Sequence, residues 1–315
     1  MASGKDRYMN VYEIITNRIL EKIEIAKNSN KPFRWVKPWS GGAPFAVSYT
    51  TGLPYRGVNR MILEPGEYIT FKALQDYRKT QPEDAQIFVK QGSHKNPVFY
   101  YGTYEKTDGD GVPVLNEYGE QEKGHYLRFY QSFNIEDIHG VHSHFPAVKS
   151  VKTSTKATKL LDKYIDAYVQ AEGLTLDIVD DGANCFYDAS RMLVRVPAKE
   201  GFKSIYEYYS SVLHELIHST SKGLNRRVGK QFGSDMYSRE ELVAQIGSQM
   251  LLAHFQIADD NDDSVNDIAY IDGWASKLRE SKQEIAKAAA QAEKAMEYFL
   301  NTGDKTSNSK EKMSA

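Results

Sequence analysis

The sequence predicts an α+β protein with two domains: a small α+β domain, followed by a mostly helical domain with a short sheet. Three observations indicate this class. The 315 residues are about twice the length of an ordinary domain. Runs rich in Tyr, Phe and Val, which favour strands, are concentrated before residue 150. From residue 202 onward, apolar residues recur almost throughout at helical spacing. We therefore predict domains at 1–148 and 149–302 and a tail at 303–315.

The first domain is expected to begin with an amphipathic helix, because apolar residues recur at helical spacing in residues 9–27. A loop rich in Pro, Gly and Trp follows, then a short helix at 53–63 and a strand that continues into a helix at 68–77. The runs QIFVKQ and NPVFYYGTYEK predict two strands joined by a turn. The polar residues 107–124 predict a hairpin insertion or loop, and HYLRFYQSFNI predicts a further strand.

The second domain follows a small, polar and basic linker at 147–158. A helix is predicted at 159–173, then three short strands around LTLDIV, ANCFYD and RMLVRVP. The remainder is expected to be helical, with a long final helix at 274–300. The tail 303–315 has almost no apolar residues to bury, so disorder is expected there.

Composition excludes several classes of protein. No apolar run approaches the roughly 18 residues that span a bilayer, and the N-terminus lacks the apolar core of a secretory signal. The single cysteine, Cys185, excludes an internal disulfide and any Cys-rich zinc site, and fits a cytoplasmic protein. Residues 1–95 hold 15 Lys+Arg against 9 Asp+Glu, so this part alone hints at a polyanionic partner; the alternative is a solvated surface.

The main chemical signal lies in residues 204–221, SIYEYYSSVLHELIHSTS, whose apolar stripe predicts a helix. His214 and His218 are four residues apart, so their imidazoles project from one face and can share one zinc ion. Glu215 is placed to accept a proton from a zinc-activated water, as the base of a metallopeptidase. The alternative is a surface helix with two unrelated histidines, but the apolar flanks favour a buried site.

A zinc site of this kind needs a third protein ligand. The best source is the helix predicted at 237–252, on which Glu241 shares a face with small residues that permit close packing on the histidine helix. Glu241 is the predicted third ligand, and Glu240 is the rival. Either could instead be an exposed glutamate in the first turn, where the helix dipole favours it.

Residues 191–196 precede the histidine helix and predict a strand. Such a strand could lie at the sheet edge over the metal and pair with an extended substrate. A purely structural strand is the equal alternative.

The first domain mixes aromatic with basic residues. Aromatic rings can stack on unpaired bases while Lys and Arg contact phosphates, which predicts binding of single-stranded DNA. The alternative is that these aromatics belong to the core. His139, His142 and His144 resemble a metal cluster, but near a domain boundary they are expected to be solvated loop residues. The candidate DNA-binding residues are Arg34, Trp35, Lys37, Trp39, Tyr55, Arg56 and Arg60.

Six stretches resemble the ArdC-type plasmid antirestriction proteins: PWSGGAPFAVSYTTGLPYRGVNRMIL, YITFKAL, FYQSFNIEDIHG, SSVLHELIHSTSKGLNR, FGSDMYSREELVAQIGSQML and YIDGWASKLRESKQEIAKAAAQAEKA. They follow one another through nearly the whole chain. The resemblance implies an N-terminal domain that binds single-stranded DNA and a zincin-like metallopeptidase domain. It assigns the zinc motif to His214, Glu215 and His218, and a downstream motif to Glu240 and Glu241. Gln245 departs from that motif, which has a carboxylate there, and a carboxylate next to the ligands normally orients a histidine.

The resulting hypothesis is a cytoplasmic, DNA-associated zinc metallopeptidase of a mobile element, with one zinc per chain and an unidentified protein substrate. A second hypothesis is a protective protein that binds single-stranded DNA and whose zinc domain is structural. The third is a metal-dependent nuclease, although nucleases commonly hold two metals in carboxylate-rich sites.

Overall fold

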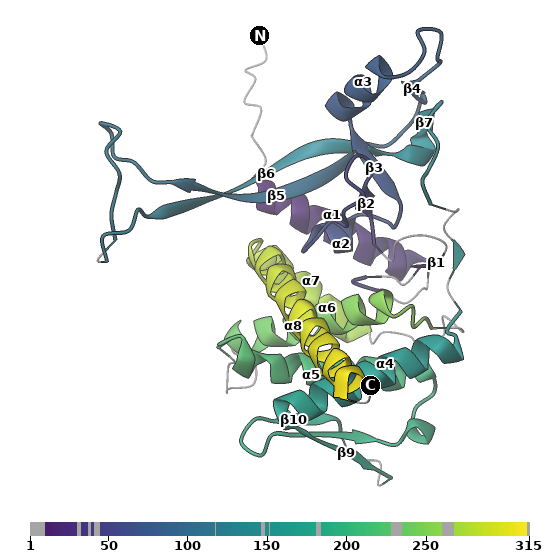
Figure 1. Ribbon diagram of the computed structural model, residues 1–315, viewed down its shortest axis with the longest axis vertical. Helices are drawn as coiled ribbons and strands as arrows, with labels where there is room; N and C mark the ends of the chain where they lie inside the picture. The colour runs from purple at the N-terminus through teal and green to yellow at the C-terminus, as the bar shows by residue number, and fades with distance from the viewer. Residues whose placement is uncertain are drawn as a thin grey trace.

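The computed structural model describes residues 10–29, 33–36, 39–40, 45–116, 118–145, 149–150, 152–180, 184–227, 235–259 and 268–313. A sheet with a long projecting hairpin lies on one side of the molecule, and a group of helices with a smaller sheet lies on the other (Figure 1). The chain is therefore an α+β protein, as its sequence predicts. Within the described part of the chain, none of the helices is long and apolar enough to cross a membrane.

The N-terminal half is built on a four-stranded sheet in the order β2-β3-β6-β5. Its β2–β3 pair is parallel, and its other pairs are antiparallel. Two further pairs, β1 with β8 and β4 with β7, are antiparallel and short. The helices of this half are α1 Val11–Asn28, α2 Asn59–Ile62 and α3 Phe71–Lys79. The strands are β1 Trp39–Ser40, β2 Val47–Ser48, β3 Glu67–Thr70, β4 Phe88–Val89, β5 Asn96–Glu105, β6 Lys123–Asn134, β7 Ile138–His139 and β8 Lys149–Ser150.

Helix α1 begins where Asn10 forms a capping box with Glu13. Its fully buried residues Ile15, Ile19 and Ile23 recur every four positions, so they form one stripe. That stripe packs on helices of the C-terminal half and belongs to the same hydrophobic core. The first helix of the chain is therefore part of the support of the second half.

Both strands predicted in residues 86–106 are present, but they do not pair with each other. Strand β4 pairs with β7, and β5 pairs with β6 over ten residue pairs. The β4–β7 pairing continues by one residue, because the backbone N–H of Lys90 donates to the carbonyl of Asp137. The polar residues 107–124, predicted as a hairpin insertion or loop, connect β5 to β6 at the far end of the hairpin, and the last two of them begin β6.

The C-terminal half contains a three-stranded sheet in the order β10-β11-β9, with β11 in the middle. An edge-strand role for residues 191–196 is therefore wrong, because both sides of β11 are occupied and the edge next to it is β10. The strands are β9 Thr175–Val179, β10 Phe186–Asp188 and β11 Leu193–Pro197. The helices are α4 Thr155–Glu172, α5 Ile205–Gly223, α6 Asp235–His254, α7 Ile268–Glu280 and α8 Glu284–Met313.

The end of the chain also differs from the prediction. Residues 274–300 form parts of two helices, because a turn after Glu280 separates α7 from α8. The tail 303–315, predicted to be disordered, continues as helix to Met313. Contacts with α4 stabilise the first residues of this tail as helix. Gly303 lies directly against the ring of Tyr164, whose hydroxyl donates to the carboxylate of Asp304.

Candidate metal centre

Helix α5 carries the two histidines of the HExxH motif and is held firmly in the core. The side chain of Ser204 caps it by accepting from the backbone N–H of Glu207. Its apolar stripe is fully buried, including Leu213 and Ile217. Helix α6 approaches closely at Gly247, where a Cβ would lie 3.1 Å from Ile217 Cδ1. This close packing brings the first turns of α6 beside the histidine face of α5.

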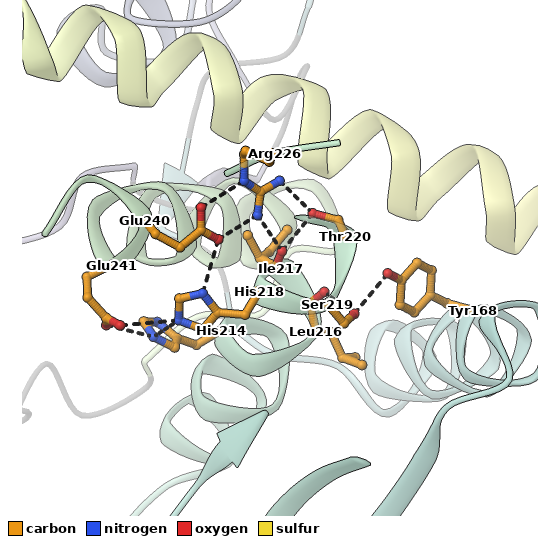
Figure 2. A network of polar contacts seen from close by, with 10 residues as sticks. All are labelled: Tyr168, His214, Leu216, Ile217, His218, Ser219, Thr220, Arg226, Glu240 and Glu241. Carbon is orange, nitrogen blue, oxygen red and sulfur yellow. Dashed lines mark hydrogen bonds and ion pairs between the residues drawn. The ribbon is translucent and has the colours of Figure 1, made fainter. Parts of the chain in front are cut away.

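His214, His218 and Glu241 converge at this contact (Figure 2). The two Nε2 atoms of the histidines are 3.1 Å apart. The Glu241 carboxylate lies 3.4 Å from His214 Nε2 and 3.5 Å from His218 Nε2. Two imidazole nitrogens and one carboxylate oxygen form a donor set suited to a divalent metal ion. The three residues that the sequence singled out as ligands are therefore brought together.

Glu240, the rival ligand, turns to the other side of His218. Its Oε1 accepts from His218 Nδ1 at 3.1 Å, and its side chain is only 2% exposed. With the proton on Nδ1, the lone pair of His218 lies on Nε2, which faces His214 and Glu241. Glu240 is therefore a positioning residue. It supplies for His218 the orienting carboxylate that the sequence lacks at Gln245.

Arg226 anchors Glu240, and sequence reasoning missed it. Its Nε and Nη2 donate to the two carboxylate oxygens of Glu240 at 2.8 and 2.6 Å. It also donates to Thr220 Oγ1 and to the carbonyl of Ile217, both at 2.9 Å (Figure 2). Burial acts to raise the pKa of Glu240, but the hydrogen bonds from Arg226 and His218 outweigh it and lower that pKa. Glu240 thus remains a charged acceptor for His218.

Glu215 lies beside the cluster and is almost fully buried. Burial raises the pKa of its carboxyl group, and the nearby histidines only partly oppose this effect. The backbone of Tyr187, on the edge strand β10, lies close to Glu215 and slightly opposes the rise of this pKa. A carboxylate with a raised pKa beside a potential metal site is suited to accept and return a proton.

The two adjacent glutamates should behave differently when replaced. We expect Glu241→Ala to weaken metal binding more than Glu240→Ala, because only Glu241 offers a donor atom to the cluster. Glu240→Ala should reduce metal affinity about 10–100-fold through loss of histidine orientation. Competition with a chelator of known affinity measures both. The opposite order would show that Glu240 is the ligand.

The candidate DNA-binding residues do not form one open surface. Trp35 and Arg60 are buried, and the burial of Trp35 fits the alternative that it belongs to the core. Arg34 pairs with Asp259 at 2.9 Å. The loop at 33–36 is buried because it packs on helices of the C-terminal half. There the backbone N–H of Val36 donates to the side chain of Gln249 at 3.2 Å.

The remaining candidates lie in different settings. Arg56 is 61% exposed, but it pairs with Glu293 and Glu297 of α8. The same Glu293 pairs with the buried Arg60 at 2.8 Å. Tyr55 is half-buried and packs edge-on against Tyr68. Lys37 and the side chain of Trp39 lie outside the described residues.

The three histidines predicted to be solvated loop residues, His139, His142 and His144, do not form a metal-binding group. His144 Nδ1 lies 2.6 Å from Glu67 Oε1, and its ring stacks on Tyr49. The ring of His139 stacks on Phe88, and His142 is exposed. Among the described residues, only His214, His218 and Glu241 form a group that could hold a metal ion.

Two family models match successive parts of the chain. Residues 9–135 match the N-terminal domain of the anti-restriction factor ArdC, and residues 163–291 match a zincin-like metallopeptidase domain. The chain is similar to two DNA primases TraC of Escherichia coli, each 30% identical over 92% of this chain. It spans only 20% and 27% of their lengths. The uncharacterized protein y4eC of Sinorhizobium fredii is 24% identical over 92% of this chain and 91% of its own length.

Two crystal structures of the antirestriction protein ArdC from plasmid R388 share the fold. The metal-free structure has a TM-score of 0.66 and 24% identity, over 94% of this chain and 99% of that one. The Mn(II)-bound structure has a TM-score of 0.64 and 23% identity, over 94% and 98%. The two matched domains together cover most of the described residues, in the order found in ArdC. The chain therefore belongs to the ArdC-type antirestriction family, with an ArdC N-terminal domain followed by a zincin-like metallopeptidase domain.

Proposed function

We propose that this chain is a zinc metallopeptidase that works in the cytoplasm and binds single-stranded DNA through its N-terminal half. The observation that carries the peptidase proposal is the convergence of His214, His218 and Glu241, with the buried Glu215 next to them. A nitrogen-rich donor set with one carboxylate suits zinc better than magnesium or calcium, which prefer oxygen ligands. The single cysteine fits a reducing compartment.

The residues around the site have separate roles in the proposed hydrolysis. His214, His218 and Glu241 would hold the ion, and Glu240 with Arg226 keeps the His218 ring in one orientation. Bound there, zinc supplies a Lewis acid that polarises a peptide carbonyl and lowers the pKa of water. Glu215 accepts a proton from the attacking water on its carboxylate and passes it to the leaving nitrogen. Its raised pKa supports this role, because it makes the carboxylate a stronger base toward the proton of the water.

The DNA part of the proposal rests on the N-terminal half. This half matches the N-terminal domain of an anti-restriction factor, and the TraC relatives that align with the chain are named as DNA primases. The excess of Lys and Arg in residues 1–95 is consistent with a polyanionic partner. The protein substrate of the peptidase is not identified by these features.

Replacing Glu215 with Gln tests the peptidase proposal. We expect Glu215→Gln to retain zinc, because the residue is not a donor in the cluster, and to lose at least about 100-fold in peptidase rate, because Gln cannot accept the proton. The measurement is the appearance of new peptide N-termini in a denatured bacterial proteome, alongside elemental analysis.

Glu207→Gln, on the first turn of the same helix, is the matched control and should retain the activity. If the wild-type protein with full zinc yields no new termini, the peptidase proposal is wrong, and a structural zinc domain in a protein that protects DNA takes its place.

A further inference from the structure

Strands β5 and β6 form a two-stranded arm that extends well beyond the rest of the molecule (Figure 1). We call residues 100–128 the arm. Its strands face each other in register, with Tyr100 opposite Arg128 and Tyr104 opposite Gly124. A two-stranded ribbon in water is only marginally stable by itself. Side chains that cover the ribbon therefore have a strong influence on its shape.

One face of the arm carries three tyrosines in a row: Tyr100, Tyr126 and Tyr104. The ring centroids of Tyr100 and Tyr126 are 6.0 Å apart, and those of Tyr126 and Tyr104 are 6.4 Å apart. Tyr100 and Tyr104 are each 53% exposed. We call these three residues the tyrosine row. Contiguous exposed patches of large apolar side chains commonly mark interaction sites.

Two glycines allow two rings of the row, those of Tyr126 and Tyr104, to lie against the ribbon. Gly102 lies opposite Tyr126, and Gly124 lies opposite Tyr104. A Cβ at Gly102 would overlap the ring of Tyr126, and a Cβ at Gly124 would overlap the ring of Tyr104. One side of each ring therefore covers a glycine backbone. The opposite side of the Tyr104 ring is presented outward, whereas that of the Tyr126 ring lies next to the Arg128 guanidinium.

The charge along this face is uneven. Arg128 lies over the ring of Tyr126, with its Cζ 4.7 Å from the ring centroid, and it adds one cation to the row. Beyond the row, residues 105–122 hold six carboxylates and one lysine. A ligand held mainly by phosphate contacts would be repelled there. A ligand held by stacking, with one phosphate near Arg128, fits this distribution of charge.

We propose that the tyrosine row, with Arg128, is the surface on which unpaired bases of single-stranded DNA stack. This inference rests on the proposed DNA binding of the N-terminal half. It moves the site from the predicted residues around Arg34 and Arg60, which pair with the C-terminal half, to the arm. Every base has a π-face that can stack on tyrosine, whereas the bases of a duplex already stack on each other.

The test uses the full-length, zinc-loaded chain and a fluorescent 20-nucleotide oligothymidylate. The wild type should bind this oligonucleotide more tightly than a duplex of the same length. Tyr126→Ala and Tyr104→Ala should each weaken binding roughly 5- to 150-fold, the value of one stacked base. Tyr101→Ala is the matched control, because Tyr101 is exposed on the opposite face of β5, and it should bind like the wild type.

A second variant tests whether the position of the tyrosine ring matters, and not only the presence of the tyrosine. Gly102→Ala keeps every aromatic residue but forces the ring of Tyr126 off the ribbon, so it should also weaken binding. The salt dependence gives an independent readout. One contact at Arg128 predicts a slope of log affinity against log salt of about −0.7. A slope several times steeper would place the DNA on a basic surface elsewhere.

The outcomes distinguish the two proposals. If the wild type does not bind the oligonucleotide at low salt, DNA binding by this chain is wrong. If the wild type binds and the tyrosine variants, with unchanged melting temperatures, bind equally well, the DNA lies elsewhere and the arm is a contact surface for protein. Loss in Tyr101→Ala equal to that in Tyr126→Ala would also overturn the assignment to this face.

Discussion

His214→Ala is expected to reduce bound metal from about one ion per chain to almost none. The variant removes one of three donors in a cluster whose atoms lie within 4.8 Å of one another. The two that remain, on His218 and Glu241, leave a site with too few ligands for tight zinc binding. Elemental analysis after exchange into buffer with a weak chelator measures the loss.

His218→Ala should give the same loss and should also disturb Glu240, because the carboxylate loses the ring that donates to it. His94→Ala is the matched control, since His94 is an exposed histidine of the N-terminal half, and its metal content should stay at the wild-type level. Full metal in both α5 variants would show that the ion binds elsewhere.

The central part of this site could be predicted from the sequence because it depends on spacing along helices. Residues four apart share a helix face, so His214 and His218 were fixed by the motif, and the helix-face argument identified Glu241. The role of Glu240 could not be fixed in this way. It depends on Arg226, which lies beyond the end of α5 and folds back to contact Thr220 and Ile217. This folding back of the chain after α5 cannot be predicted from the periodicity of apolar residues in the sequence.

The fold shows the same limit. Periodicity predicted α1 and the β-prone runs predicted β5 and β6, because these are local properties. Strand pairing is not local, so the sequence did not identify β7 as the partner of β4. Aromatic and basic residues near Trp35 were predicted as a DNA surface, because composition does not distinguish a stacking residue from a core residue. Their partners, such as Asp259 and Glu293, lie more than two hundred residues away in sequence.

The buried pair of Arg34 and Asp259 leads to a prediction of large effect on stability. Their side chains are 9% and 7% exposed, and Arg34 Nη2 lies 2.9 Å from Asp259 Oδ2. The guanidinium also lies 4.7 Å from the ring centroid of Tyr206, on helix α5. Arg34→Ala leaves a buried carboxylate without this partner, so it should lower the free energy of unfolding by about 3–5 kcal/mol. Denaturation in urea, followed by circular dichroism, measures the change.

Two further variants decide whether the pair acts through burial. Arg18→Ala removes an arginine from an exposed pair with Glu21, so it should cost no more than about 1 kcal/mol. The double variant Arg34→Met with Asp259→Leu should recover most of the loss, because apolar residues of similar volume often replace a buried ion pair without cost. If Arg34→Ala is as mild as Arg18→Ala, the contact does not hold the loop at 33–36 on the C-terminal half. Arg34 would then again be a candidate for contact with DNA phosphates.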